Sequence, residues 1–188
     1  MHPLLRENYD DLVRAVADAK AGLDALDRCA ALVADTLQAG HKVLTAGNGG
    51  SAADALHLAE ELVGRYRENR RALPAIALVA DGTALTCIGN DFGFDQVFAR
   101  QVEALGAPGD VLVLFTSSGN SANLLAALEM AKKRGLSTVA LNGRGGGKLK
   151  GLAEAEWIVS SNSGGRVQEL HGWAIHVILE VVEARLFA

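Results

Sequence analysis

The 188-residue sequence has few cysteines, few prolines and no surplus of positive charge. Its two cysteines, Cys29 and Cys87, form no CxxC metal pair and are too few for a disulfide framework, so a reducing compartment is expected. Lys and Arg number 18 against 22 Asp and Glu, and this balance argues against a generic nucleic-acid or anionic-membrane binder. The hydrophobic share of 49% excludes a disordered chain.

The sequence also has no long apolar run. No stretch reaches the ~18 residues of a membrane-spanning helix, and the longest candidate, 172–182, is interrupted by Glu180. The N-terminal segment contains the charged residues Arg6 and Glu7, which leave no room before them for the apolar core of a signal peptide. We therefore expect a cytoplasmic protein without a membrane segment.

Short apolar runs and helical patterns alternate along most of the chain. The runs lack the polar alternation of half-exposed strands, which predicts buried strands at 42–46, 75–79, 111–115, 137–141 and, more weakly, 156–160. Helical spacing of apolar residues lies between them, at 52–63, 96–105, 122–134 and about 166–186. This alternation predicts an α/β fold, a three-layer doubly wound sandwich around a five-stranded parallel sheet.

The first forty residues predict two helices, separated at Gly22 and closed by Gly40. The length of the chain fits a single domain. We expect one domain over 1–188, in which 1–40 is a helical pair used in packing or oligomerisation and 41–188 is the α/β core.

Glycine is the residue in excess, with 21 glycines against 3 prolines. Thirteen of them follow the predicted strands, where open parallel sheets bind their ligands. The excess therefore predicts backbone brought close to a ligand. The run 145–147 is the exception, because no side chain near it suggests a role, and we interpret it as a mobile turn.

The first predicted strand leads through a glycine-rich loop, Gly47-Asn48-Gly49-Gly50-Ser51, directly into a helix. Its glycines allow close approach of a ligand, and Ser51 can cap the helix while offering a hydroxyl group. The spacing differs from the GxGxxG dinucleotide fingerprint, and no Lys-Ser or Lys-Thr follows as in a Walker loop. Taken alone, the loop is equally consistent with a tight turn that binds nothing.

The third predicted strand is followed by Thr116-Ser117-Ser118-Gly119-Asn120-Ser121, again at the start of a helix. Four hydroxyl side chains and a glycine at a helix N-terminus form a neutral, donor-rich cradle for a phosphate monoester. One serine suffices to cap a helix, so the number of hydroxyls favours phosphate binding. Asn90 and Asp91, after the second predicted strand, offer polar groups suited to sugar hydroxyls.

His57 and Glu61 are four residues apart on the helix after the glycine-rich loop. This spacing puts them on one face, roughly 6 Å apart, close enough to share a divalent metal. The last predicted helix offers Gln168, His171 and His176. Gln168 and His176 are separated by about 12 Å of helix rise, which is far for one ion on a straight helix. This favours a composite site between subunits and leaves His171 as a rival to His176.

Basic residues gather at Arg65, Arg67, Arg70 and Arg71, just after the helix that carries His57 and Glu61. A run of charges in a connecting segment is usually exposed to solvent. We interpret this run mainly as a solvated loop face.

Several motifs, in order along the chain, resemble the phosphoheptose isomerases, which are sedoheptulose 7-phosphate isomerases of the sugar isomerase (SIS) fold. They are Gly47-Asn48-Gly49-Gly50-Ser51, His57-x-x-x-Glu61, Gly64-Arg65, Gly89-Asn90-Asp91, Ser118-Gly119-Asn120-Ser121 and Arg166-Val167-Gln168-Glu169-x-His171. The resemblance covers nearly the whole chain, including the paired N-terminal helices. The serine-rich loop alone is typical of the wider SIS group.

The resemblance implies one zinc ion per subunit, with the ligands His57, Glu61, Gln168 and His176. It implies that a sugar-phosphate substrate is contacted by Asn48, Gly49, Gly50, Ser51, Glu61, Asn90, Asp91, Thr116, Ser117, Ser118, Ser121 and Gln168. It also implies a homotetramer with active sites at subunit interfaces. The chain departs from the family at 116–117, where the order of the two hydroxyl residues is exchanged, and at 163–165, where some members carry an acidic or hydroxyl side chain.

The implied reaction converts sedoheptulose 7-phosphate to D-glycero-D-manno-heptose 7-phosphate through an enediol. We assign Glu61 as the base and His176 as the acid that shuttles the oxygen proton. Zinc would polarise the carbonyl, and the sequence leaves open whether it is catalytic, structural or inhibitory. Two alternatives are a non-catalytic SIS sugar-phosphate-binding or interaction protein of the replication-initiation type, and an isomerase of another sugar phosphate. The presence of both Glu61 and His176 favours an isomerase.

Overall fold

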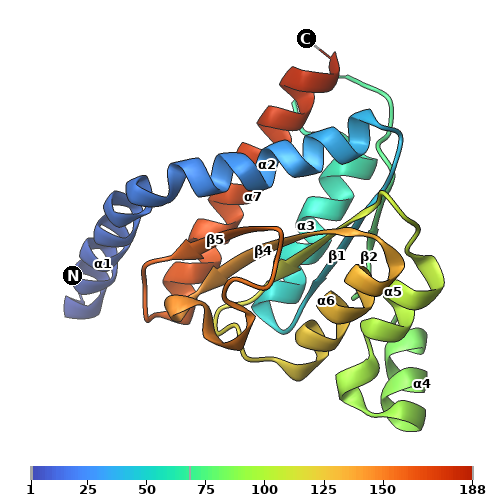
Figure 1. Cartoon of the computed structure of the whole chain (residues 1–188). Coiled ribbons are helices and arrows are strands. Elements are labelled where there is room, and N and C mark those ends of the chain that lie inside the picture. The colour runs from blue at the N-terminus through green and yellow to red at the C-terminus, as the bar shows by residue number, and fades with distance from the viewer. Residues whose placement is uncertain (1, 68, 188) are drawn as a thin grey trace.

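The computed structural model describes residues 2–67 and 69–187, and a parallel β-sheet forms its centre (Figure 1). The strands in the described part of the chain are β1 (Val43–Gly47), β2 (Ala75–Ala77), β3 (Val111–Phe115), β4 (Ser137–Gly143) and β5 (Ala155–Val159). They lie in the order β2-β1-β3-β4-β5, and every neighbouring pair is parallel. The predicted five-stranded parallel sheet is confirmed.

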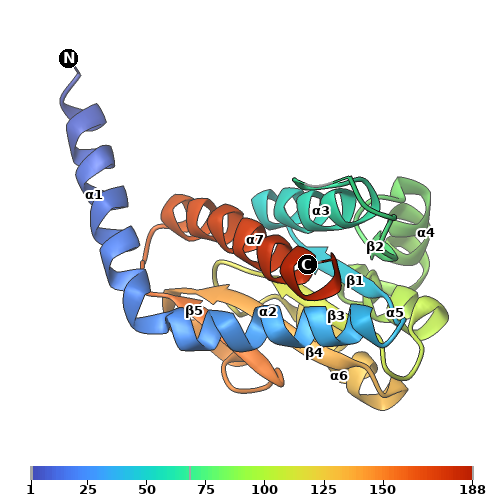
Figure 2. The same ribbon diagram turned by 90° about the horizontal axis from the view of Figure 1, so that it is seen from above.

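Helices cover both faces of this sheet. They are α1 (Pro3–Ala19), α2 (Leu23–Gln38), α3 (Gly50–Val63), α4 (Gly82–Phe92), α5 (Ala99–Leu105), α6 (Ala122–Arg134) and α7 (Gly164–Phe187), with 3₁₀ turns at Lys20–Gly22, Phe94–Gln96 and Arg144–Leu149. Helices α2, α3 and α7 pack on one face, and α5 and α6 on the other (Figures 1 and 2). The three-layer sandwich with two N-terminal helices is therefore as predicted.

The central strands are buried on both faces, which explains their uninterrupted apolar sequences. Along β3, Val111, Val113 and Phe115 point into the core beneath α2, α3 and α7, whereas Leu112 and Leu114 point into the core beneath α5 and α6. The strand order reverses between β1 and β3, and such a switch point opens a crevice at the carboxyl ends of the two strands. The glycine-rich and serine-rich loops both leave the sheet there.

Helix α4 lies between the strand predicted at 75–79 and the helix predicted at 96–105, where the sequence indicates no further helix. Asp81 starts this helix, because its carboxylate accepts hydrogen bonds from the backbone N–H groups of Thr83 and Ala84 at 2.9 and 3.0 Å. No residue of α4 is fully buried. The helix therefore lacks the strong apolar stripe by which a sequence reveals a helix.

Helix α1 projects away from the body of the molecule (Figure 2). It exposes the large apolar side chains Leu4, Leu5, Tyr9, Val13 and Val16. Such a contiguous exposed apolar surface is typical of a protein–protein contact. None of the described helices is long and apolar enough to span a membrane.

Candidate functional site

A small cavity lies where the loops after β1 and β3 meet. Asn48, in the loop after β1, is joined to Asn123, in the first turn of α6, because each side-chain amide donates to the other's oxygen at 2.9 Å. The cavity has a volume of about 80 Å³ and is lined by Asn48, Ser51, Phe115, Thr116, Ser117, Ser118, Ser121 and Leu124. Every hydroxyl residue predicted for the phosphate cradle thus lies around one cavity at the N-terminal end of α6.

The glycine-rich loop supplies the other wall. Gly49 has a positive φ of +60° and immediately precedes α3, which begins at Gly50. The Ser51 side chain is buried against the cavity, and α3 shows no side-chain cap. Ser51 is therefore placed for contact with a ligand, and the capping role considered from sequence is not seen.

Thr116 shapes the serine-rich loop from within. Its buried hydroxyl accepts hydrogen bonds from the backbone N–H groups of Gly119 at 3.1 Å and Ser118 at 3.4 Å. The chain thereby turns at the N-terminus of α6, where free N–H groups and the helix dipole favour an anion. The arrangement suits a phosphate group and contains no cationic side chain among the cavity-lining residues.

The glycine run 145–147, expected to be a mobile turn, packs beneath this loop. The Leu149 N–H donates to the carbonyl of Gly119 at 2.9 Å, and the Lys148 N–H donates to the Asn120 side chain at 3.1 Å. Gly145, Gly146 and Gly147 all have positive φ values, which glycine adopts without strain. The run therefore packs against the serine-rich loop, where Gly146 and Gly147 adjoin Gly119 and Ser118.

A second group of polar side chains lies between α3 and α7, which pack against each other. On α3, His57 Nε2 is 3.7 Å from Glu61 Oε1. The His176 ring, from α7, lies with its centroid 5.2 Å from that of His57, and the Tyr66 ring stacks on it with a centroid distance of 5.4 Å. The structure thus brings together three of the four residues predicted as metal ligands.

The chemistry of this group fits a zinc ion. One donor atom each from His57, Glu60 and Glu61 lie within 4.8 Å of one another, and His176 adds a second imidazole beside His57. Zinc in proteins takes imidazole nitrogen and carboxylate oxygen ligands. Glu60 is exposed and is not needed for the set, because His57, Glu61 and His176 already supply two imidazoles and a carboxylate.

Gln168, on α7, lies near the start of α3 and away from the group formed by His57, Glu61 and His176. Its side chain lies over Gly50, so closely that a Cβ at position 50 would be 2.6 Å from its Cδ atom. Gly50 precedes His57 by seven residues, about 10 Å of helix rise. Within one chain, Gln168 is therefore beside the glycine-rich loop and separated along α3 from the two histidines.

His171, the rival to His176, belongs to the core. Its side chain is fully buried between the rings of Phe115 and Trp157, and Nε2 lies 3.4 Å from the carbonyl oxygen of Asn142. Its Nδ1 faces Asp54 Oδ2 at 3.9 Å, and among the described residues neither atom has a hydrogen-bond partner. Of the two histidines, His176 is the one beside His57.

Burial has opposite effects on the protonation of this Asp54–His171 pair. It raises the pKa of Asp54 to about 6, partly offset by the nearby His57. It lowers the pKa of His171 to about 4, partly offset by the bond to Asn142. Between pH 4 and 6 the folded pair therefore holds one proton, on Asp54. In the unfolded chain the two residues also hold one proton, but it is on the histidine, because the ordinary pKa is 3.8 for an aspartate and 6.5 for a histidine.

We predict that single substitutions will unmask these opposed effects in the metal-free protein. In Asp54→Asn only His171 remains, and its lowered pKa makes the free energy of unfolding rise by about 3 kcal/mol between pH 4 and 6.5. In His171→Gln only Asp54 remains, and its raised pKa makes the free energy fall as the pH rises from 3.8 to 6. Urea unfolding at several pH values measures both slopes. Two variants with the same slope would contradict the assignment.

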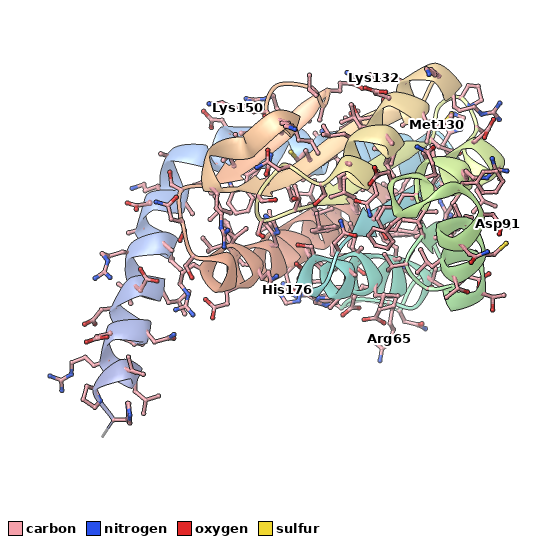
Figure 3. The ribbon with its side chains drawn as sticks, turned by 90° about the horizontal axis from the view of Figure 1, so that it is seen from below. Arg65, Asp91, Met130, Lys132, Lys150 and His176 are labelled. Atoms are coloured by element: carbon pink, nitrogen blue, oxygen red, sulfur yellow. The ribbon has the colours of Figure 1, made fainter. Side chains whose placement is uncertain are left out.

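Asn90 and Asp91 are not brought to the cavity of their own chain. They are exposed at the end of α4, where the Asn90 amide donates to the Asp91 carboxylate at 2.7 Å. Neither residue lines the cavity. Figure 3 shows Asp91 on α4 and His176 beside α3.

Comparisons with known proteins agree with this architecture. A family profile described as "SIS domain" matches residues 7–143. Two proteins named phosphoheptose isomerase are similar to the chain. The one from Geobacter sp. (strain M21) is 53% identical over 87% of this chain and 85% of its own, and the one from Serratia proteamaculans (strain 568) is 46% identical over 97% and 94%.

Solved structures are similar as well. Phosphoheptose isomerase GmhA from Neisseria gonorrhoeae is 39% identical, with a TM-score of 0.89 over 96% of this chain and 97% of its own. A phosphoheptose isomerase from Francisella tularensis is 34% identical, with a TM-score of 0.93 over 98% of this chain and 100% of its own. The same fold thus extends over nearly the full length of each.

Proposed function

The chain belongs to the phosphoheptose isomerase family of SIS-domain proteins, and we propose that it interconverts sedoheptulose 7-phosphate and D-glycero-D-manno-heptose 7-phosphate. One observation carries the proposal. A hydroxyl-lined cavity suited to phosphate occurs in the same chain as a carboxylate, Glu61, and an imidazole, His176, that both flank His57. A protein that only binds sugar phosphates needs the cavity alone.

The proposed mechanism uses Glu61 as the base. Its carboxylate removes a proton from C1 of the ketose to give an enediol, and the carboxyl group, after exchange with solvent, delivers a proton to C2 to give the aldose. His176 moves the oxygen proton in the opposite sense, by donating to the carbonyl oxygen at C2 and accepting from the hydroxyl at C1. The Tyr66 ring, stacked on His176, holds the imidazole plane in place for this transfer.

We propose zinc as the metal of this site, one ion per subunit. His57, Glu61 and His176 would hold it. The family resemblance adds Gln168 as a fourth ligand, which a neighbouring subunit would supply, because the chain's own Gln168 lies over Gly50. When bound, zinc supplies a Lewis acid that stabilises negative charge on the substrate oxygens. Because Glu61 serves in both roles, metal affinity and turnover should both respond to its substitution.

The projecting helix α1 supports a proposed homotetramer with active sites at subunit interfaces. Beside its exposed apolar residues lies an apolar groove of about 400 Å³, lined by Leu12, Val16, Ala19, Lys20, Leu23, Glu169, Leu170 and Trp173. Asn90 and Asp91 lie outside the cavity of their own chain, so a neighbouring subunit is where their predicted substrate contacts would be made. Light scattering of the purified protein should give the mass of four chains. We also propose a cytoplasmic location.

Turnover against five-, six- and seven-carbon ketose phosphates tests the proposed function, with zinc added or removed by a chelator. We expect aldose product from sedoheptulose 7-phosphate at the highest kcat/KM. Preference for a shorter sugar would identify an isomerase of another sugar phosphate. Binding without any product, together with tight association with another protein, would support the non-catalytic alternative.

We predict that Gly50→Ala will raise KM about tenfold, because the new methyl group displaces the Gln168 side chain from its position over the glycine-rich loop. Tenfold corresponds to about 1.4 kcal/mol, close to the loss of one hydrogen bond. Gly82→Ala is a matched control, since a Cβ there meets no atom within 4 Å. Steady-state kinetics of the two variants measure the effect, and an unchanged KM in Gly50→Ala would remove Gln168 from the proposed substrate contacts.

A further inference from the structure

The basic segment that follows α3 is only partly the solvated face expected from sequence. Arg67 is exposed and pairs at 2.6 Å with the exposed Glu180. The side chain of Arg70, in contrast, is 1% exposed and pairs at 2.8 Å with the side chain of Glu183 of α7, which is 9% exposed. A buried ion pair is costly to form and adds little net stability, so its presence beside the site calls for another explanation.

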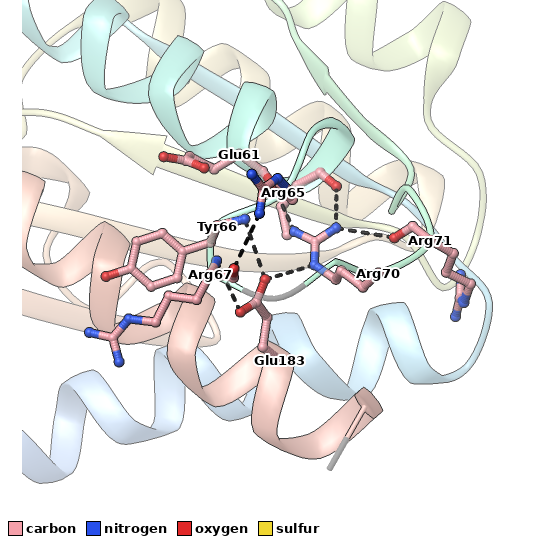
Figure 4. A network of polar contacts seen from close by, with 8 residues as sticks. Glu61, Arg65, Tyr66, Arg67, Arg70, Arg71 and Glu183 are labelled. Atoms are coloured by element: carbon pink, nitrogen blue, oxygen red, sulfur yellow. Dashed lines mark hydrogen bonds and ion pairs between the residues drawn. The ribbon is translucent and has the colours of Figure 1, made fainter.

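Arg70 binds the end of the helix that carries Glu61. Its Nη2 donates to the backbone carbonyl of Glu61 at 2.8 Å, and its Nη1 donates to that of Leu62 at 3.0 Å. The last carbonyl groups of a helix have no partner within it, and the Arg70 guanidinium satisfies two of them. Figure 4 shows this guanidinium between the end of α3 and Glu183. The backbone of Glu61 is therefore fixed by a cation held from α7.

Glu183 also fixes the loop between α3 and Arg70. Its two carboxylate oxygens accept from the backbone N–H groups of Tyr66 and Arg67, both at 3.4 Å (Figure 4). The Tyr66 ring then stacks on His176, two turns earlier on α7. The ion pair is thus connected to both residues assigned to proton transfer. It is connected to the base, Glu61, through the backbone carbonyl, and to the acid, His176, through the stacked ring of Tyr66.

We propose that Arg70 and Glu183 are positioning residues for the isomerisation: together they hold Glu61 and, through Tyr66, His176 at the separation that proton transfer across one C–C bond requires. This inference rests on the proposed function. Neither residue lines the hydroxyl-lined cavity. They act by joining the end of α3, the backbone of Tyr66 and Arg67, and α7.

Substitutions that preserve size test the pair, because truncating either side chain would leave buried polar groups without a hydrogen-bond partner. Glu183→Gln keeps the shape and an accepting oxygen but removes the negative charge. Arg70→Lys keeps the positive charge but loses the planar guanidinium that donates to several acceptors at once. Small misplacement of catalytic groups is costly in rate. We expect kcat to fall about 10- to 100-fold in each variant, with KM changed less than about threefold.

Zinc affinity, measured on the apo-protein with zinc alone, provides a readout independent of turnover. We expect it to fall about tenfold, as it does when residues that orient metal ligands are changed. The double variant should lose little more than either single variant, because the two residues act as one unit. Asp35→Asn is the control, since it removes a carboxylate from the exposed Arg185–Asp35 pair, which also involves α7.

Three results separate the interpretations. Glu183→Gln and Arg70→Lys variants that lose thermal stability yet keep the parent's kcat and zinc affinity would show a purely structural pair and overturn the proposal. Equal losses of kcat in Asp35→Asn would overturn it too. If the parent protein turns over none of the ketose phosphates, the proposed function fails, while the zinc affinities still decide whether the pair positions Glu61 and His176.

Discussion

Glu61→Gln is expected to lower kcat for the ketose phosphate by about 10³-fold while leaving the folded structure intact. The amide has the size of the carboxylate but cannot accept the proton at carbon. The side chain is largely buried, 21% exposed, and lies 3.7 Å from His57, so a similar shape should pack as before. Steady-state kinetics and thermal unfolding of the two proteins provide the measurement.

Glu60 supplies the matched control for this substitution. It is the neighbouring carboxylate on α3, it is exposed, and one of its oxygens lies in the same 4.8 Å cluster. Glu60→Gln should change kcat by less than a few-fold, because the proposed proton transfer does not use it. Equal losses in the two variants would indicate that only the summed negative charge matters. A Glu61→Gln variant that binds substrate and keeps the parent's turnover would falsify the assignment of the base.

Gly119→Ala is expected to open the phosphate cradle and to raise KM by at least about 100-fold. Gly119 has φ +65°, and a Cβ there would overlap the carbonyl group of Gly146, whose carbon would be 2.5 Å away. The neighbour is backbone, so the serine-rich loop and the glycine run must move apart. A 100-fold change corresponds to about 2.8 kcal/mol, the loss of two or more hydrogen bonds to the phosphate.

Gly145→Ala separates this collision from backbone strain. Gly145 also has a positive φ, +75°, yet a Cβ there would meet no atom within 4 Å. It should cost about 1–2 kcal/mol of stability, the ordinary penalty of a left-handed conformation, and leave KM near that of the parent. Kinetics of both variants, with inorganic phosphate as a competitive ligand, make the comparison. Similar KM values for the two would show that the glycine run does not support the cradle.

The sequence predicted the sheet well because its central strands β1 and β3 are buried on both faces, whereas the edge strand β2 is shorter and more exposed than the buried strand expected at 75–79. Runs such as 111–115 must be apolar throughout when helices cover each side, and glycines mark where each strand ends. Helix α4 was not predicted, because it is poorly buried. It buries no residue fully, so burial imposes little periodicity on its sequence, and its two glycines resemble a loop.

The candidate site was predictable where spacing along one helix decides proximity. His57 and Glu61 are neighbours by the geometry of any α-helix. The choice between His171 and His176 required the packing of α7 against α3, which puts one histidine in the core and the other beside His57. Arg70 shows a related limit, because its burial depends on Glu183, a partner more than one hundred residues away.

Isomerisation of sedoheptulose 7-phosphate in deuterium oxide, followed by proton NMR, tests the central claim most directly. If Glu61 moves a proton between C1 and C2 through an enediol, its carboxyl group exchanges with solvent, and the aldose product should carry deuterium at C2. Incorporation should disappear in Glu61→Gln and persist in Glu60→Gln. An aldose formed at the parent's rate without deuterium at C2 points to a hydride shift and contradicts this mechanism. No aldose at all contradicts the proposed function.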